Sequence, residues 1–210
     1  MIPAIQAQTI GIFQSTEQKY TIKILEGDAM LPWLEELAKM QALYEEWPYF
    51  CCANLAEDRE SIERIMNLNG VASVAFDEKG KLSGVAMGRP QELVSCVNKA
   101  FPNEARVFHM QHWLVLPEHR NKKVASTLYT ALENHVRATG RFDRISCATV
   151  ILPNDFRLPA PPNAFSLDAS FQKRSFTRFK PETEFSFVWQ LIDEPNDTKH
   201  PMALWMKDLH

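Results

Sequence analysis

A basic loop near the middle of the chain, residues 120–126 (RNKKVAS), carries residue types that hold phosphate. An apolar run precedes the loop, and a helix follows it in which Val124, Leu128 and Leu132 recur every four residues. We expect Asn121 to cap this helix. The first N–H groups of a helix have no acceptors within it, and the helix dipole adds partial positive charge there. The pattern therefore predicts a phosphate site built from backbone.

Two histidines in the apolar run, His109 and His112, are the candidates for proton transfer. Histidine suits that role because its unperturbed pKa is ~6.5. Strand alternation places His109 and Gln111 on one face, and Met110 and His112 on the other. A bulge in this strand would re-aim either histidine. We expect at least one of the two to be a hydrogen-bonded structural residue.

The elements that must position these residues alternate along the chain. Apolar and β-branched runs predict strands at residues 20–25, 71–76, 81–87, 107–116, 144–150 and 184–191. Helical spacing predicts helices at residues 28–47, 57–68, 91–100, 121–139 and 163–174, the first capped by Asp28 and ended by Pro48. A proline-rich loop occupies residues 152–162. Residues 1–19 form a lead segment, and residues 20–210 form a single domain.

The composition is that of an ordinary globular enzyme domain. The 210 residues are 45% hydrophobic and 23% charged, with a net charge of −3. That charge disfavours a nucleic-acid-binding module and gives no general attraction to an anionic membrane. No apolar run is long enough to cross a bilayer, and the four cysteines lack metal-ligand spacing. We therefore expect a cytoplasmic protein without a metal site, either a monomer or a homodimer.

Five segments carry a resemblance to a largely uncharacterised bacterial group within the GNAT superfamily of N-acetyltransferases. That group's segments run EYPY, FYFGESVLLPEYRGRGIG, FCAV, PLDAFWRKRGY and KPLTFW. This chain reads EWPYF from Glu46, FHMQHWLVLPEHRNKKVA from Phe108, SCATV from Ser146, SLDASFQKRSF from Ser166 and KHPMALWMKDL from Lys199. The order and approximate spacing agree, and the second segment is the most diagnostic.

The resemblance implies an α/β (α+β) GNAT fold. Its mixed central sheet of six to seven strands splays open at the central strand and is flanked by about four helices. It also implies acetyl-CoA as acyl donor, with the pantetheine arm along the central strand and the pyrophosphate in the basic loop. The cofactor-binding residues that it implies are Leu114, Val115, Leu116, Arg120, Asn121, Lys122, Lys123, Val124, Ala125 and Ser126.

The resemblance also indicates where this chain departs from the superfamily. Lys123 stands where the loop normally has its first glycine, which lets the backbone approach the pyrophosphate. His109 occupies the register of the base in several relatives, so we expect His109→Ala to lower turnover more than His112→Ala. His112 stands at the glutamate of the closer group. Phe171 replaces the usual tyrosine acid and cannot donate a proton.

The acceptor site implied by the resemblance includes Glu46, Tyr49 and Phe50. Aromatic rings with a carboxylate suit a cationic amine. The sequence therefore indicates an N-acetyltransferase that acts on a primary amine of a small molecule or peptide. The alternative is a degenerate relative that binds acyl-CoA or a protein partner without turnover, as the departures at Lys123, His112 and Phe171 would allow.

Overall fold

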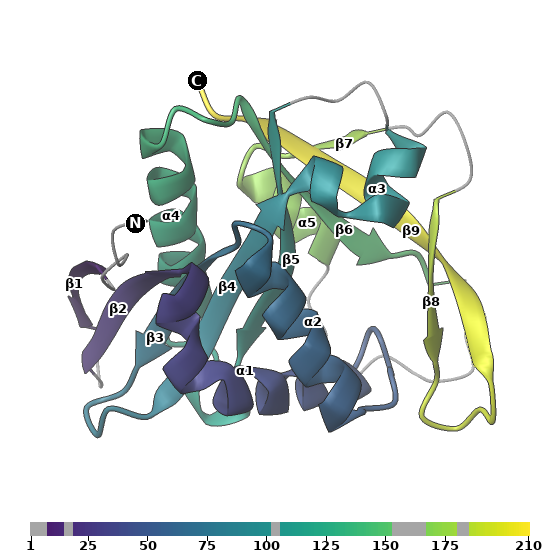
Figure 1. Cartoon of the computed structure of the whole chain (residues 1–210), viewed down its shortest axis with the longest axis horizontal. Helices are drawn as coiled ribbons and strands as arrows, with labels where there is room; N and C mark the ends of the chain where they lie inside the picture. Colours follow the sequence, from purple (N-terminus) through teal and green to yellow (C-terminus); the bar gives the residue numbers. More distant parts are fainter. Residues whose placement is uncertain (1–7, 15–18, 102–105, 153–166, 180–184) are drawn as a thin grey trace.

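The computed structural model of the chain describes residues 8–14, 19–101, 106–152, 167–179 and 185–210. One nine-stranded sheet runs through these residues in the order β1-β2-β3-β4-β5-β6-β9-β7, with β8 paired to β9 (Figure 1). The strands are β1 (Gln8–Gln14), β2 (Lys19–Glu26), β3 (Val71–Phe76), β4 (Leu82–Pro90), β5 (Val107–Val115), β6 (Arg144–Val150), β7 (Thr177–Phe179), β8 (Ser186–Gln190) and β9 (Asp197–Asp208).

Helices cover both faces of this sheet. The α-helices are α1 (Leu34–Met40), α2 (Leu55–Asn67), α3 (Ser95–Ala100), α4 (Val124–Ala138) and α5 (Leu167–Lys173). Four short 3-10 helices join them to the strands: η1 (Gly27–Trp33), η2 (Gln41–Glu45), η3 (Gln91–Leu93) and η4 (Pro117–His119). No helix among the described residues has the length and apolar character needed to cross a membrane.

Strand β5 is where the sheet opens. It pairs in parallel with β6 only from Val107 to Met110, opposite Arg144 to Cys147. Beyond that point β6 continues antiparallel to β9 as far as Val150, whereas residues 112–115 of β5 pair with β4 alone among the described strands. The second half of β5 therefore has one edge without a strand partner among the described residues. The splayed mixed sheet that the sequence predicts is confirmed.

A β-bulge sits at the mouth of this gap. Met87 pairs with His112 and Gly88 with Met110, so Gln111 is an extra residue in β5. The insertion resets the alternation of side chains: Met110 and Trp113, three residues apart, both pack in the core beneath α4. His112 contacts Tyr44 of η2 on the opposite face. The prediction that Met110 and His112 share a face is therefore wrong, and the bulge is the reason.

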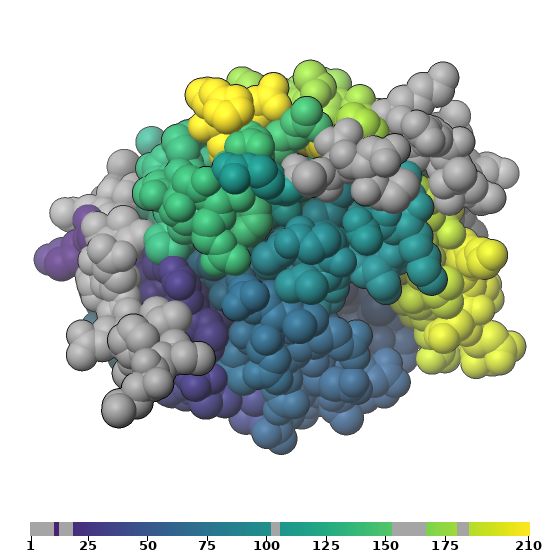
Figure 2. All heavy atoms as spheres, turned by 45° about the horizontal axis from the view of Figure 1, so that its top comes forward, coloured from purple at the N-terminus to yellow at the C-terminus, as the bar shows by residue number. Residues whose placement is uncertain are grey.

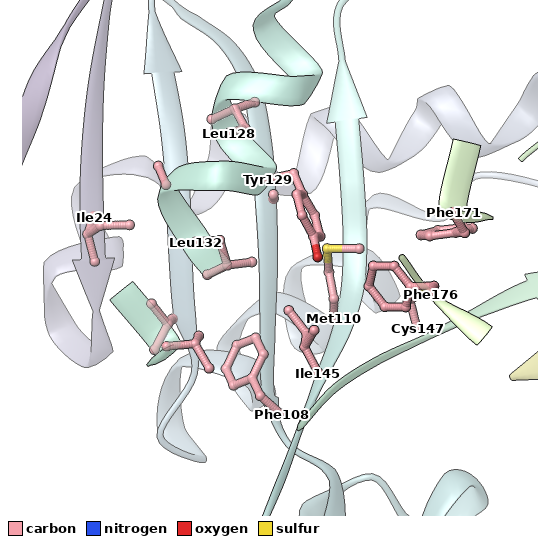
Figure 3. Close-up of a cluster of buried hydrophobic side chains, with 14 of the residues drawn as sticks. Ile24, Phe108, Met110, Leu128, Tyr129, Leu132, Ile145, Cys147, Phe171 and Phe176 are labelled. Carbon is pink, nitrogen blue, oxygen red and sulfur yellow. The ribbon is translucent and has the colours of Figure 1, made fainter. Parts of the chain in front are cut away.

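Two of the three hydrophobic clusters among the described residues pack the sheet against α4 on one face and against α1 and α2 on the other. On one face Leu128 and Leu132 of α4 pack over Phe108, Met110 and other strand residues (Figure 3). On the other face residues of α1 and α2 pack over alternate positions of β2, β3 and β4. Figure 2 shows yellow residues of the β8–β9 hairpin on one flank of the molecule, further yellow C-terminal residues at the top, and purple N-terminal residues on the opposite flank. The hydrophobic clusters on the two faces place the second half of β5 between two packed layers.

Several predicted elements differ from the observed ones. Residues 28–47 form η1, α1 and η2 in succession, because Pro32 lacks an N–H group and its ring opposes a continuous α-helix through the first turns. Asp28 caps nothing there, since Glu26 is the N-cap. Strands β1, β7 and β9 raise the strand count above the six to seven expected, and β1 ties part of the lead segment to β2. The proline-rich loop and residues 163–166 lie mostly outside the described residues.

Gly88 gives a test of the bulge. A Cβ atom at this position would lie 2.1 Å from the carbonyl oxygen of His109. We expect Gly88→Ala to lower the free energy of unfolding by about 1–3 kcal/mol, because the backbone of β5 must shift. Gly11→Ala is the matched control, since nothing lies within 4 Å of the added methyl group. Equal chemical-denaturation midpoints for the two variants would contradict the tight β4–β5 approach.

Candidate active site

A cavity of about 1050 Å³ occupies the gap beside β5. Its walls come from the η2 loop on one side, the second half of β5 and the following loop in the middle, and β6 and α5 on the other side. The described residues that line it are Leu43, Tyr44, Glu46, Trp47, Pro48, Tyr49, Phe50, Met110, Gln111, His112, Trp113, Leu114, Val115, His119, Arg120, Asn121, Lys123, Val124, Ala125, Ser126, Cys147, Ala148, Thr149, Leu167, Ser170, Phe171 and Arg174.

The loop between β5 and α4 turns through two left-handed residues. Asn121 has φ 61° and Lys123 has φ 62°, the region that glycine adopts most readily. Lys123, not Asn121, is the N-cap residue of α4, and no side chain caps the helix. The prediction that Asn121 caps it is therefore wrong. The left-handed backbone that a glycine would supply is present even though the residue is lysine.

The predicted cofactor residues fall into two groups. Eight of them line the cavity: Leu114, Val115, Arg120, Asn121, Lys123, Val124, Ala125 and Ser126. Leu116 and Lys122 are not among its lining residues, and the N–H group of Leu116 donates to the carbonyl of Ser83. The residues present fit an acyl-CoA. The free edge of β5 can pair with amides, and the N-terminus of α4 with its neighbouring cations can hold phosphate.

Arg120 joins this loop to the opposite wall of the cavity. Its Nε donates to the carbonyl of Val115 at 3.1 Å, and its Nη1 donates to Glu46 Oε2 at 2.7 Å. Both side chains of the ion pair are close to half exposed, at 41% and 46%. Exposed pairs of this kind stabilise a fold by only about 0.2–1 kcal/mol. The contact is therefore well formed but weak.

His112 directly follows the bulge residue Gln111 and lines the cavity. Its Nδ1 lies 3.0 Å from the Tyr44 hydroxyl, while its Nε2 is buried and has no hydrogen-bond partner among the described atoms. Burial, with a smaller contribution from the positive charge of Arg89, lowers the pKa of His112 to about 4. The imidazole is therefore neutral at physiological pH. Burial also keeps the pKa of Tyr44 well above its usual range.

His109 lies away from the cavity. Its Nδ1 is 2.9 Å from Ser146 Oγ, which in turn donates to Gln91 Oε1 at 2.9 Å. Burial, followed by the nearby charge of Arg89, lowers the pKa of His109 to about 3. It is not among the residues that line the cavity. Of the two predicted histidines, only His112 is brought to the cavity, and His109 has the surroundings of a structural residue.

The predicted acceptor residues Glu46, Tyr49 and Phe50 all line the cavity. Tyr49 packs edge-on against Tyr44, with ring centroids 4.9 Å apart, and burial keeps its pKa above the usual value. Its carbonyl accepts a hydrogen bond from the indole N–H of Trp189 at 3.0 Å. This aromatic wall is anchored to β8, which pairs with β9 in the final hairpin of the chain.

The position expected for a general acid is apolar. Phe171 is 4% exposed and stacks on Trp205, with centroids 5.9 Å apart. One turn later, the Arg174 guanidinium lies over the rings of Trp113 at 5.1 Å and Tyr129 at 4.5 Å. Arg174 is a cavity residue that sequence reasoning missed. Its place three residues after Phe171, in the SLDASFQKRSF segment, was the available signal.

Comparisons with known proteins bear on this geometry. Residues 34–158 match the Acetyltransferase (GNAT) family. No curated protein sequence matches the chain significantly. Among solved structures, an acetyltransferase of the GNAT family from Listeria monocytogenes 4b F2365 is similar, with a TM-score of 0.60 at 11% identity, covering 94% of this chain and 99% of that one.

Two further solved structures share the fold. A spermidine N-acetyltransferase from Vibrio cholerae, in complex with CoA and spermine, gives a TM-score of 0.55 at 13% identity over 90% of this chain and 95% of that one. An acetyl transferase from Salmonella typhimurium that modifies the N-terminal serine of 50S ribosomal subunit protein L7/L12 gives 0.54 at 12% identity, over 94% and 99%. At these identities the structures establish the fold alone.

The family match covers the site as well as the scaffold. Residues 34–158 extend from α1 past β6, so they include every described wall of the cavity except α5 and Arg174. The splay of β5 from β6 and the basic loop before α4 both lie within the match. On this match and the shared fold, the chain belongs to the GNAT family of acetyltransferases.

Proposed function

We propose that this protein transfers an acetyl group from acetyl-CoA to a primary amine of a small molecule or a peptide. The observation that carries the proposal is that two buried side-chain atoms at the bulge, Gln111 Oε1 and His112 Nε2, have no hydrogen-bond partner among the described residues. An unsatisfied buried polar atom costs about 1–3 kcal/mol. With the His112 proton on Nδ1 and directed at the Tyr44 hydroxyl, Nε2 is an acceptor. An entering amine, which has N–H donors, would satisfy both atoms.

The donor side of the cavity suits acetyl-CoA, whose thioester supplies the carbonyl that the amine attacks. The left-handed turn at Lys123 and the N-terminus of α4 would hold the pyrophosphate by backbone N–H groups. The free edge of β5 at Leu114 and Val115 would pair with the pantetheine amides. The relative from Vibrio cholerae, which has the same fold, was solved with CoA.

The acceptor side suits a cationic amine. Glu46 is the sole carboxylate among the described residues that line the cavity, and it lies with Tyr49 and Phe50. Carboxylates and aromatic faces both stabilise an ammonium group. Two structural relatives act on amines of different size, spermidine in one and the N-terminal serine of a ribosomal protein in the other. Both acceptor classes remain within the proposal.

A bound ammonium group would first lose one proton to solvent, because only the neutral amine has the lone pair that attacks. Neutral His112 would then accept the second proton as the new C–N bond forms. The Tyr44 hydroxyl fixes the orientation of the ring through Nδ1. Because burial holds the pKa of His112 at about 4, the imidazole is unprotonated at every pH near neutrality. We place His112, rather than His109, in this role, since His109 is committed to Ser146 outside the cavity.

The position at which the superfamily carries its tyrosine acid is Phe171 in this chain, so that position offers no proton to the departing thiolate. A thiol pKa of ~8.5 makes departure as the anion tolerable. The guanidinium of Arg174, one turn from Phe171 and also in the cavity wall, would stabilise the negative charge. Protonation from solvent would then complete the reaction.

Apolar Phe171 also favours a second candidate, a protein that binds acyl-CoA without turnover. A thiol-release assay with acetyl-CoA and a broad panel of amines and N-terminal peptides separates the two, run beside a calorimetric titration with CoA. Amine-dependent release above the buffer rate supports the transferase. Binding and thermal protection by CoA without release support the binder. No binding up to millimolar CoA would contradict both.

We expect His112→Ala to lower kcat by about 10²–10⁴-fold, the usual contribution of a positioned base. His109→Ala should leave more of kcat intact and lower the melting temperature instead, because it breaks the buried contact with Ser146. Steady-state kinetics and thermal unfolding of both variants measure the two effects. A larger kcat loss in the His109 variant would reverse the assignment.

The pH profile should lack the limb of an ordinary histidine. His112 is in its basic form above pH ~4, so kcat/KM should fall through a histidine ionisation only near that value and not near 6.5.

The free energy of unfolding should also decrease as the pH falls. The folded-state pKa values of His109 and His112, about 3 and about 4, lie below the unfolded value, so their contribution is complete above pH ~6.5 and is lost as the pH falls below it. Unfolding curves at pH 7.5 and 5 check this.

Phe171→Tyr restores the missing phenol at the acid position. We expect kcat to rise or stay unchanged, because a donor for the thiolate is added and the ring keeps its volume. Phe176→Tyr is the matched control, since it adds the same hydroxyl to the same core away from the cavity lining. Pre-steady-state measurement of thiol release gives the rate. Loss of activity specific to the Phe171 variant would contradict solvent- and arginine-assisted departure.

A further inference from the structure

The charges around the cavity are unevenly distributed. Arg120, Lys123 and Arg174 contribute three cations, and Glu46 contributes the sole carboxylate among the described lining residues. That carboxylate is already engaged, since Glu46 Oε2 lies 2.7 Å from Arg120 Nη1. In this state the cavity attracts an anion and repels an ammonium group.

Glu46 is held at its backbone but not at its side chain. Its N–H donates to the carbonyl of Leu43, and its carbonyl accepts from the N–H groups of Tyr49 and Phe50. The side chain is nearly half exposed, and its partner among the described residues is Arg120. A change of side-chain rotamer can therefore give the Glu46 carboxylate a new partner while the backbone of the loop stays in place.

Arg120 is placed to make that exchange. It follows η4 directly, in the loop that would hold the donor's phosphates, and its Nε is anchored on the carbonyl of Val115. A guanidinium binds phosphate in a bidentate fork, whereas its present ion pair is solvent-exposed and screened. A phosphate group arriving at Lys123 and the N-terminus of α4 competes directly with Glu46 for Arg120.

We propose that the Arg120–Glu46 ion pair is a latch that makes Glu46 the ammonium-recognition residue of the acceptor site only after donor phosphate has claimed Arg120. The donor's negative charge offsets the loop cations at the same time. The inference rests on the proposed function and adds to it a specificity residue, Glu46, whose side chain becomes available to an ammonium group when Arg120 is bound to phosphate.

Calorimetric titration with CoA tests the latch without any turnover. Glu46→Gln removes the competitor for Arg120, so CoA should bind about threefold more tightly at low salt. Arg120→Gln should weaken binding, and adding Glu46→Gln to it should give no further gain. Glu45→Gln is the matched control, because Glu45 contacts the N–H of Ala53 and does not line the cavity. An unchanged or weaker CoA affinity in the Glu46 variant overturns the latch.

A second titration tests the ammonium assignment, with phenethylamine as the cationic probe and 2-phenylethanol as its neutral match. Phenethylamine should bind CoA-saturated protein at least fivefold more tightly than the free protein, and Glu46→Gln should abolish that difference. The neutral alcohol should show no such dependence on CoA. Absence of probe binding to the CoA complex, or equal binding in both states, overturns the assignment. Failure to bind CoA at all would instead contradict the proposed function.

Discussion

The architecture of the site depends on how briefly β5 and β6 stay together. Four residues of β5 pair with β6, and then the strands part because β6 follows β9 instead. Two hydrophobic layers, under α4 on one side and under α1 and α2 on the other, keep β5 in place through the part that lacks a second neighbour. A sheet edge buried inside a domain is costly unless something pairs with it. The fold therefore keeps a strand edge without a strand partner among the described residues at the place where an extended ligand would lie.

The bulge at Gln111 adds unpaired polar side-chain atoms at the same place. By inserting one residue, it turns His112 toward Tyr44 and leaves two polar atoms without partners. Buried polar groups without hydrogen-bond partners cluster at functional sites, where a bound ligand can pair with them. The polar face of the gap thus arises from one irregularity in the pairing of β4 with β5, with Gly88 opposite it because no larger residue fits.

The parts of the structure that follow short-range rules could be predicted from the sequence. Strand β3 and strand β6 have the predicted bounds, since apolar runs between turn residues define them. The loop before α4 was found because strand, basic loop and helix are contiguous. The register of the bulge was not predictable, because it depends on how β4 and β5 approach, and it decided which histidine reaches the cavity. The contact between Glu46 and Arg120 could not be predicted from local sequence patterns either, because the two residues are 74 positions apart and meet only through the tertiary fold.

Strand β9 has a consequence for the order in which the molecule can be assembled. Strands β1 to β5 form a meander of neighbours, so they can pair as they emerge from the ribosome. Strand β6 bonds to β5 over only four residues, and its other edge waits for β9 at residues 197–208, which also carries β7 and β8. Pairing between strands that are distant in sequence is slow, because the intervening chain must first be closed into a loop. Strands β1 to β5 can thus pair early, whereas β6, which forms one wall of the cavity, gains its second neighbour only once β9 has been made.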